Sequence, residues 1–206
     1  MLITISRQFG AGGSEVARRV AAALGWSVVD NEFIDEVAAR AGLPPEEVAK
    51  LEERAPSFVE RLALTMATSA PELFPPATGT TQDVDETSVV RMTESLVAEL
   101  AAEGRVVMVG RAAPAVLGQR GDGLHVKLVA GLEFRTRQAA ERLGVSGKEA
   151  GEVLRRTDKN RERYHREYYK RDWNDPVNYD MVINTERLGF AGATDVIVAR
   201  ARAMGQ

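Results

Sequence analysis

The stretch that most constrains the fold runs from Leu2 to Leu24, where an apolar run, a glycine turn and an amphipathic segment follow one another directly. Leu2, Ile3 and Ile5 form a short β-favouring run, which predicts a strand buried in a central sheet. The residues after the turn predict a helix with one apolar face. The apolar positions of that face are Val16, Val20 and Leu24, with Ala17, Ala21 and Ala23 beside them.

The turn between this strand and helix contains Gly10, Gly12 and Gly13. Because glycine has no side chain, backbone N–H groups in such a turn can point at one anion while the next helix begins immediately behind them. The glycines alone fit a tight strand-to-helix turn equally well. The position of the turn, after a β run and before an Ala-rich helix, favours a phosphate-binding loop. Ser14 then offers its hydroxyl to Mg²⁺, or serves only as a helix-start residue.

The loop matches the phosphate-binding pattern GxxxxGK[ST] at two of its four fixed positions. With Gly12 on the second glycine, Ser14 falls on the hydroxyl position. Arg7 stands where the first glycine belongs, and Gly13 stands where the lysine belongs. The predicted phosphate-binding backbone groups are those of Gly10, Ala11, Gly12, Gly13 and Ser14.

Two further strands are predicted to end near this loop. The run from Trp26 to Val29 ends at Asp30, and the run from Arg105 to Gly110 has the apolar character of a central parallel strand. Ligands of α/β sheets collect at the carboxyl ends of strands. Asp30 is therefore a candidate to accept a substrate hydroxyl or to hold a metal-bound water. Its alternative role is the N-cap of a helix over Glu32 to Ala41.

The segment from Arg155 to Arg171 carries the strongest local charge, with eight basic residues against three acidic ones. With Tyr164, Tyr168, Tyr169 and Trp173 interleaved, it allows an RNA-binding helix or a solvated charged helix. The whole chain has a formal charge of -3 and a pI near 5.6, which argues against a protein devoted to nucleic acid. Any basic site must therefore be local.

Three stretches together resemble the cytidylate-kinase-like family, a branch of the P-loop nucleoside monophosphate kinases. They are ITISRQFGAGGSEVARRVAAALGWSVVDNEFIDEVA, VVMVGRAA and DWNDPVNYDMVINTERL. The resemblance spans nearly the whole chain. Its ISR-x-(F/Y)-G-x-GG opening is specific to that branch, which as a group lacks the usual P-loop lysine. The resemblance implies a P-loop kinase fold, which is an α/β fold with a five-stranded parallel sheet flanked by helices.

The same resemblance assigns candidate residues for the phosphate acceptor. Related kinases carry an aspartate matching Asp30 in their acceptor region. They also carry a DGRD run that Gly110 and Arg111 match, so Arg111 is a candidate phosphate fork. Asp158 and Arg161 match a D-x-x-R pair that contacts the acceptor nucleotide.

Both aspartates of the DGRD run are replaced, by Val109 and Ala112. The first of them is the usual carboxylate that helps to hold Mg²⁺. The resemblance therefore implies an ATP and Mg²⁺ site in which Ser14 and water hold the metal, and in which arginines supply the charge of the missing lysine. Arg7, Arg156 and Arg161 are the predicted catalytic residues.

The resemblance divides a single 206-residue domain into a core and two inserted segments. The core comprises residues 1–30, 84–145 and 174–206. Residues 31–83 correspond to an acceptor-binding insertion, and residues 146–173 to an arginine-rich lid. For the proline-containing part from Pro71 to Gln82, a surface loop without a role is the alternative.

The function implied is ATP-dependent phosphoryl transfer to a nucleoside monophosphate such as CMP. Three alternatives remain: a kinase of another small molecule, a nucleotide-binding regulator without turnover, and an RNA-binding protein acting through Arg155 to Arg171. The sequence has no cysteine, which excludes disulfides and thiolate metal sites and fits a cytoplasmic location. No stretch resembles a signal peptide or a membrane span, so we expect no membrane partner.

Overall fold

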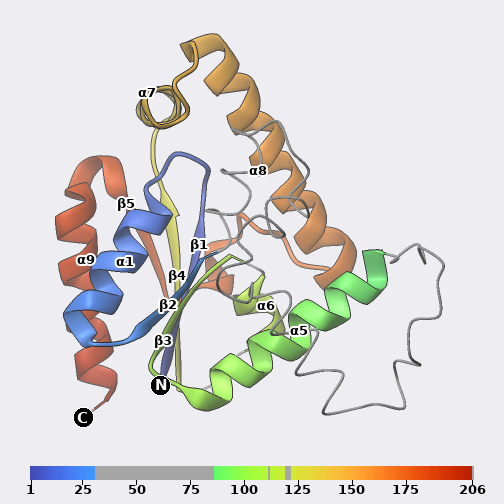
Figure 1. Cartoon of the computed structure of the whole chain (residues 1–206), viewed down its shortest axis with the longest axis vertical. Coiled ribbons are helices and arrows are strands. Elements are labelled where there is room, and N and C mark those ends of the chain that lie inside the picture. Colours follow the sequence, from blue (N-terminus) through green and yellow to red (C-terminus); the bar gives the residue numbers. More distant parts are fainter. Residues whose placement is uncertain (31–85, 111, 119–121, 206) are drawn as a thin grey trace, which may run out of the picture. The chain divides into compact units, whose positions relative to one another are not determined.

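The computed structural model describes residues 1–30, 86–110, 112–118 and 122–205 (Figure 1). The chain divides into two compact units, residues 1–31 with 97–206, and residues 32–96. The expected insertion, residues 31–83, lies outside the described residues. The account below concerns the first unit.

A five-stranded sheet forms the centre of this unit, and all of its strand pairs are parallel. The strands are β1 (Leu2–Arg7), β2 (Ser27–Asp30), β3 (Val106–Val109), β4 (Gly123–Val129) and β5 (Met181–Asn184), in the spatial order β2-β3-β1-β4-β5. Since parallel strands end at the same edge, the residues that follow them gather there. The predicted α/β fold with a five-stranded parallel sheet is confirmed.

Helices cover both faces of the sheet (Figure 1). The described helices are α1 (Gly13–Leu24), α5 (Glu86–Glu103), of which residues 97–103 belong to this unit, α6 (Ala113–Leu117), α7 (Leu132–Leu143), α8 (Gly147–Tyr169) and α9 (Thr185–Met204), with a short 3-10 helix, η2 (Pro176–Asn178). Helices α1 and α9 bury their apolar residues against Ile3 and Ile5 of β1. The last turns of α5, together with α6, bury Leu2 and Met108 on the opposite face. No helix in the described ranges is both long enough and apolar enough to cross a membrane.

Local sequence signals fix where these helices begin and end. Ser146 and Glu149 form a capping box at the start of α8. Gly25 and Gly144 end α1 and α7 in the left-handed conformation that glycine adopts without strain. The helices therefore form where the pattern of apolar residues and caps places them.

Polar residues occupy one face of the central strands. Thr4 Oγ1 lies 2.8 Å from His125 Nδ1, and Ser6 accepts a hydrogen bond of 2.9 Å from the Trp173 indole. His125 and Lys127 lie on the same face and are buried, with only 6% and 2% of their surface exposed. Strand β4 begins two residues before His125, and the segment after α8 covers this face.

Candidate functional site

The glycine turn between β1 and α1 has no room for side chains at two positions. Gly10 has φ of 79°, and a Cβ atom on it would lie 2.5 Å from the carbonyl oxygen of Arg135. Gly12 has φ of 78°, and a Cβ atom on it would overlap the ring of Phe190. Both positions require glycine for conformation and for space. The turn is therefore packed against α7 on one side and α9 on the other.

The side chain of Arg7 fills the space beside Gly13, the third glycine of the turn. A Cβ atom on Gly13 would lie 2.6 Å from Arg7 Cγ, so the stem of Arg7 fills the volume that a side chain at position 13 would enter. The guanidinium group then lies against Gly110, where a Cβ atom would overlap Nη1. Its Nη2 atom lies 3.9 Å from Asp30 Oδ1. Arg7 is 7% exposed, and its charge is held where β1, β2 and β3 end.

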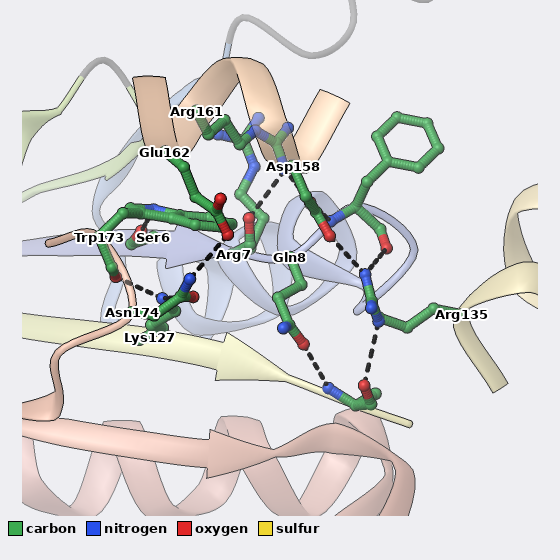
Figure 2. A network of polar contacts seen from close by, with 12 residues as sticks. Ser6, Arg7, Gln8, Lys127, Arg135, Asp158, Arg161, Glu162, Trp173 and Asn174 are labelled. Atoms are coloured by element: carbon green, nitrogen blue, oxygen red, sulfur yellow. Dashed lines mark hydrogen bonds and ion pairs between the residues drawn. The ribbon is translucent and has the colours of Figure 1, made fainter. Parts of the chain in front are cut away.

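Helix α8 directs two of the predicted residues at the same loop (Figure 2). Arg161 Nη1 donates a 2.8 Å hydrogen bond to the carbonyl oxygen of Arg7, and Asp158 Oδ1 accepts a 2.8 Å hydrogen bond from the Phe9 amide. Arg161 Nη1 and Asp158 Oδ1 are 3.8 Å apart and form an ion pair. The structure thus brings together Arg7, Asp30, Asp158, Arg161 and the glycine turn.

Two predicted site residues are not brought to the loop in this way. Arg156 is exposed and lies two residues before Asp158, so it projects from roughly the opposite side of α8. Its catalytic role stays a prediction. Arg111 lies outside the described residues, although Gly110 immediately before it touches the Arg7 guanidinium.

The end of β5 also contacts the loop. Thr185 is fully buried, and its hydroxyl donates a 2.9 Å hydrogen bond to the carbonyl oxygen of Ala11. Asn184 accepts hydrogen bonds from the amides of Glu186 and Arg187, and so caps α9. These contacts fix the middle of the glycine turn relative to the last strand.

The residues of the turn fit a phosphate and Mg²⁺ by their chemistry. Gly12 is the N-cap of α1, and in the described part of the chain no side chain caps that helix. Its first-turn N–H groups are therefore suited to an anion. The described residues contain no cluster of three or more metal-binding side chains. A magnesium ion here would be held by the half-buried Ser14 hydroxyl, phosphate oxygens and water.

Sequence reasoning missed the buried Lys127. Its Nζ donates hydrogen bonds to the carbonyl oxygen of Trp173 and, at 3.0 Å, to Asn174 Oδ1 (Figure 2). The ammonium group also lies 3.9 Å from the centre of the Trp173 ring. Lys127 thereby fastens the segment after α8 to β4. A lysine inside a largely apolar strand was the available signal, because a buried charge needs partners.

The same segment bears on the RNA-binding alternative. Trp173 is 2% exposed, so its ring cannot stack on a base. Its indole N–H donates a hydrogen bond to Ser6 Oγ, and its carbonyl oxygen accepts a 2.8 Å hydrogen bond from the Tyr179 hydroxyl. The most favourable stacking residue of the basic segment is thus part of the protein interior.

Burial of Lys127 makes stability depend on pH. Burial lowers the pKa of Lys127 from 10.5 to about 8, against the opposing effect of Asp172 and other carboxylates. Between these two values the unfolded chain binds the proton and the folded chain does not, so this group makes the protein more stable as pH rises. We expect the unfolding free energy of wild type, minus that of Lys127→Met, to rise by on the order of 1 kcal/mol per pH unit in this window.

Urea denaturation from pH 7 to 10.5 measures this difference. Lys148→Met, at an exposed position on α8, is the matched control. If the unfolding free energies of wild type and Lys127→Met change with pH in the same way, the expected coupling between this amine and folding is contradicted.

Comparison with known proteins agrees with this fold. A family model described as "Cytidylate kinase-like family" matches residues 2–187. The chain is 29% identical over 198 residues to a cytidylate kinase of Pyrobaculum aerophilum, covering 95% of this chain and 90% of the relative. It is 26% identical over 205 residues to a cytidylate kinase of Methanothrix thermoacetophila, covering 99% of each.

Solved structures give the same fold at lower identity. An uncharacterised protein from Eubacterium ventriosum matches with a TM-score of 0.61 and 22% identity over 98% of each chain. Shikimate kinase from Acinetobacter baumannii, solved in complex with shikimate, matches with a TM-score of 0.50 and 16% identity, covering 98% of this chain and 93% of that one. With the parallel sheet and the glycine loop, these matches establish the P-loop kinase fold. The chain belongs to the cytidylate kinase-like family.

Proposed function

We propose that this protein transfers a phosphoryl group from ATP to a nucleoside monophosphate, with CMP the preferred acceptor. Family membership supports nucleotide kinase activity, and the two cytidylate kinases among its relatives support CMP. The observation that carries the proposal is the position of Arg7. Its buried guanidinium lies beside a glycine loop that lacks the usual lysine, at the edge where three strands end.

In this proposal the loop and α1 bind the donor. Backbone N–H groups of Gly10 to Ser14 hold the ATP phosphates, and Ser14 with water holds Mg²⁺. The metal ion neutralises charge on the phosphates when it is bound. Arg7 and Arg161 stabilise the charge that spreads over the transferred group.

The acceptor lies on the other side of Arg7. Asp30 ends β2, and β3, which lies between β2 and β1, leads in the sequence toward Arg111. Arg111 would bind the acceptor phosphate bidentately, and Asp30 would orient Arg7 through their ion pair. Phosphoryl transfer depends on positioning and charge more than on a nucleophilic side chain, so a site made of arginines and backbone N–H groups is sufficient.

A second candidate, a nucleotide-binding regulator without turnover, is supported by Val109. This residue stands where related kinases have the metal-binding aspartate, and it is 2% exposed in the core with Ile5 and Val16. Its side chain can provide no ligand for Mg²⁺. The regulator would bind ATP but release no ADP.

A panel of acceptors read by ADP release separates these functions. We expect ADP formation with MgATP to be fastest with CMP or dCMP, slower with UMP, AMP and GMP, and absent with shikimate. ADP release with a non-nucleotide acceptor alone would identify another small-molecule kinase. If ATP raises the melting temperature while no acceptor yields ADP, the regulator is the correct function and the kinase proposal fails.

A further inference from the structure

We propose that Asp158 and Arg135 are positioning residues that hold the peptide groups around Phe9 and thereby fix the phosphate-binding loop; this inference rests on the proposed function. The resemblance to the family suggested for Asp158 a contact with the acceptor nucleotide. In this chain its carboxylate is directed at the donor loop instead (Figure 2). The two roles predict different kinetic behaviour.

The backbone of Phe9 is held at both its N–H and its carbonyl group. The N–H donates to Asp158 Oδ1 at 2.8 Å, and the carbonyl oxygen accepts from Arg135 Nη1 at 3.3 Å. Arg135 Nη1 also lies 2.6 Å from Asp158 Oδ2. The three residues come from the loop, α7 and α8, and they form a closed ring of contacts, which we call the Phe9 clamp.

Arg135 is itself held in place by the end of β4. Its Nε atom donates a 3.0 Å hydrogen bond to the carbonyl oxygen of Ala130, whose N–H donates to Gln8 Oε1 at 3.2 Å. The backbone N–H of Gln8 donates a 3.0 Å hydrogen bond to the carbonyl oxygen of Leu128. Gln8, the residue before Phe9, is thus bonded to the end of β4, which also holds Arg135.

The clamp acts directly on the first glycine of the turn. Gly10 follows Phe9, and its Cα faces the backbone carbonyl of Arg135 so closely that a Cβ atom has no room. Any displacement of the Arg135 backbone therefore changes the contact between its carbonyl group and Gly10. Arg161 adds a contact to the carbonyl oxygen of Arg7, two residues before Phe9.

Packing of the two helices does not depend on these polar contacts. Phe9, Ala139, Ala150 and Leu154 form an apolar cluster that already joins the loop, α7 and α8. The side chains of Arg135 and Asp158 are 9% and 15% exposed, and three of their hydrogen bonds end on the backbone of Phe9 or Ala130. Their arrangement matches a role in setting the loop backbone, which is the part that binds phosphates.

The test compares Asp158→Ala and Asp158→Asn with the control Arg137→Ala, an exposed arginine of α7. Because small displacements of a positioned group cost up to about 100-fold, we expect Asp158→Ala to raise the KM for ATP about tenfold or more. The KM for the acceptor stays within about twofold, because the peptide groups that the clamp holds belong to the donor loop. Asp158→Asn, which keeps an oxygen for the Phe9 amide, shows a smaller rise, and Arg137→Ala shows none.

Hydrogen exchange gives a second readout that needs no turnover. Amides of residues 10–16 exchange faster in Asp158→Asn than in wild type, and the Arg137→Ala control matches wild type. A raised acceptor KM with unchanged ATP KM and unchanged loop exchange overturns the inference. If wild type releases no ADP with any acceptor, the proposed function fails, and loop exchange alone decides the clamp: faster exchange supports it and unchanged exchange overturns it.

Discussion

Arg7→Ala is expected to reduce kcat about 1,000-fold, in the range of the loss caused by removing an arginine that neutralises a transferred phosphoryl group. Arg7 is the buried cation that contacts both the glycine turn, at Gly13, and the end of β3, at Gly110. Because it is only 7% exposed, solvent cannot supply a substitute charge at that place. Steady-state ADP release with saturating MgATP and CMP measures the effect.

Arg7→Lys is the matched comparison. It keeps the positive charge and loses the planar fork that reaches Asp30 and Gly110 together, so we expect a loss of about 10-fold to 100-fold. Thermal unfolding of both variants controls for the buried ion pair with Asp30. An Arg7→Ala protein that unfolds like wild type and keeps its kcat would remove Arg7 from the reaction.

Gly13→Lys places the missing lysine in the loop, and we expect it to harm the protein. The new side chain must enter the volume filled by the Arg7 stem, 2.6 Å from where its Cβ would stand. Overpacking of this kind costs about 1–3 kcal/mol of unfolding free energy. The displaced guanidinium also leaves the strand ends, so kcat falls with stability.

The double variant Arg7→Gly/Gly13→Lys tests the reason for that harm. It restores all four fixed positions of GxxxxGK[ST] and removes the clash. We expect it to regain about tenfold or more of the kcat lost in Gly13→Lys, because residues in contact are strongly coupled. Arg7→Gly alone serves as the control and should behave like Arg7→Ala. If Gly13→Lys alone matches wild type in stability and kcat, the two side chains do not compete for one space.

The sheet and most helices could be predicted because their signals are local. The apolar runs that became β1 and β3, and the glycines that end α1 and α7, depend on neighbours in the sequence. Parallel strands then place Asp30 and Arg7 at one edge without further information. The choice of Arg7, Asp158 and Arg161 as site residues followed from the loop and the family pattern, whereas the contact of Asp158 with the Phe9 amide was not predicted.

The parts that could not be predicted depend on contacts distant in the sequence. Phe9 meets Asp158 across 149 residues, and Lys127 meets Asn174 across 47. The partners of Lys127 lie in the segment after α8, and packing sets the path of that segment. Arg135 and Arg137 have the same local character, yet one is buried against Asp158 and the other is exposed. The partners of Arg135 at Phe9, Ala130 and Asp158 distinguish the two, and these lie on other elements.

Titration of MgATP into the wild-type protein and into Arg7→Ala by calorimetry tests the central claim most directly, namely that a glycine loop without its lysine binds a triphosphate with the help of Arg7. We predict saturable binding to wild type with Kd below about 1 mM and clearly weaker binding to Arg7→Ala. No measurable affinity of the wild-type protein for either ATP or GTP in the presence of magnesium would contradict the claim.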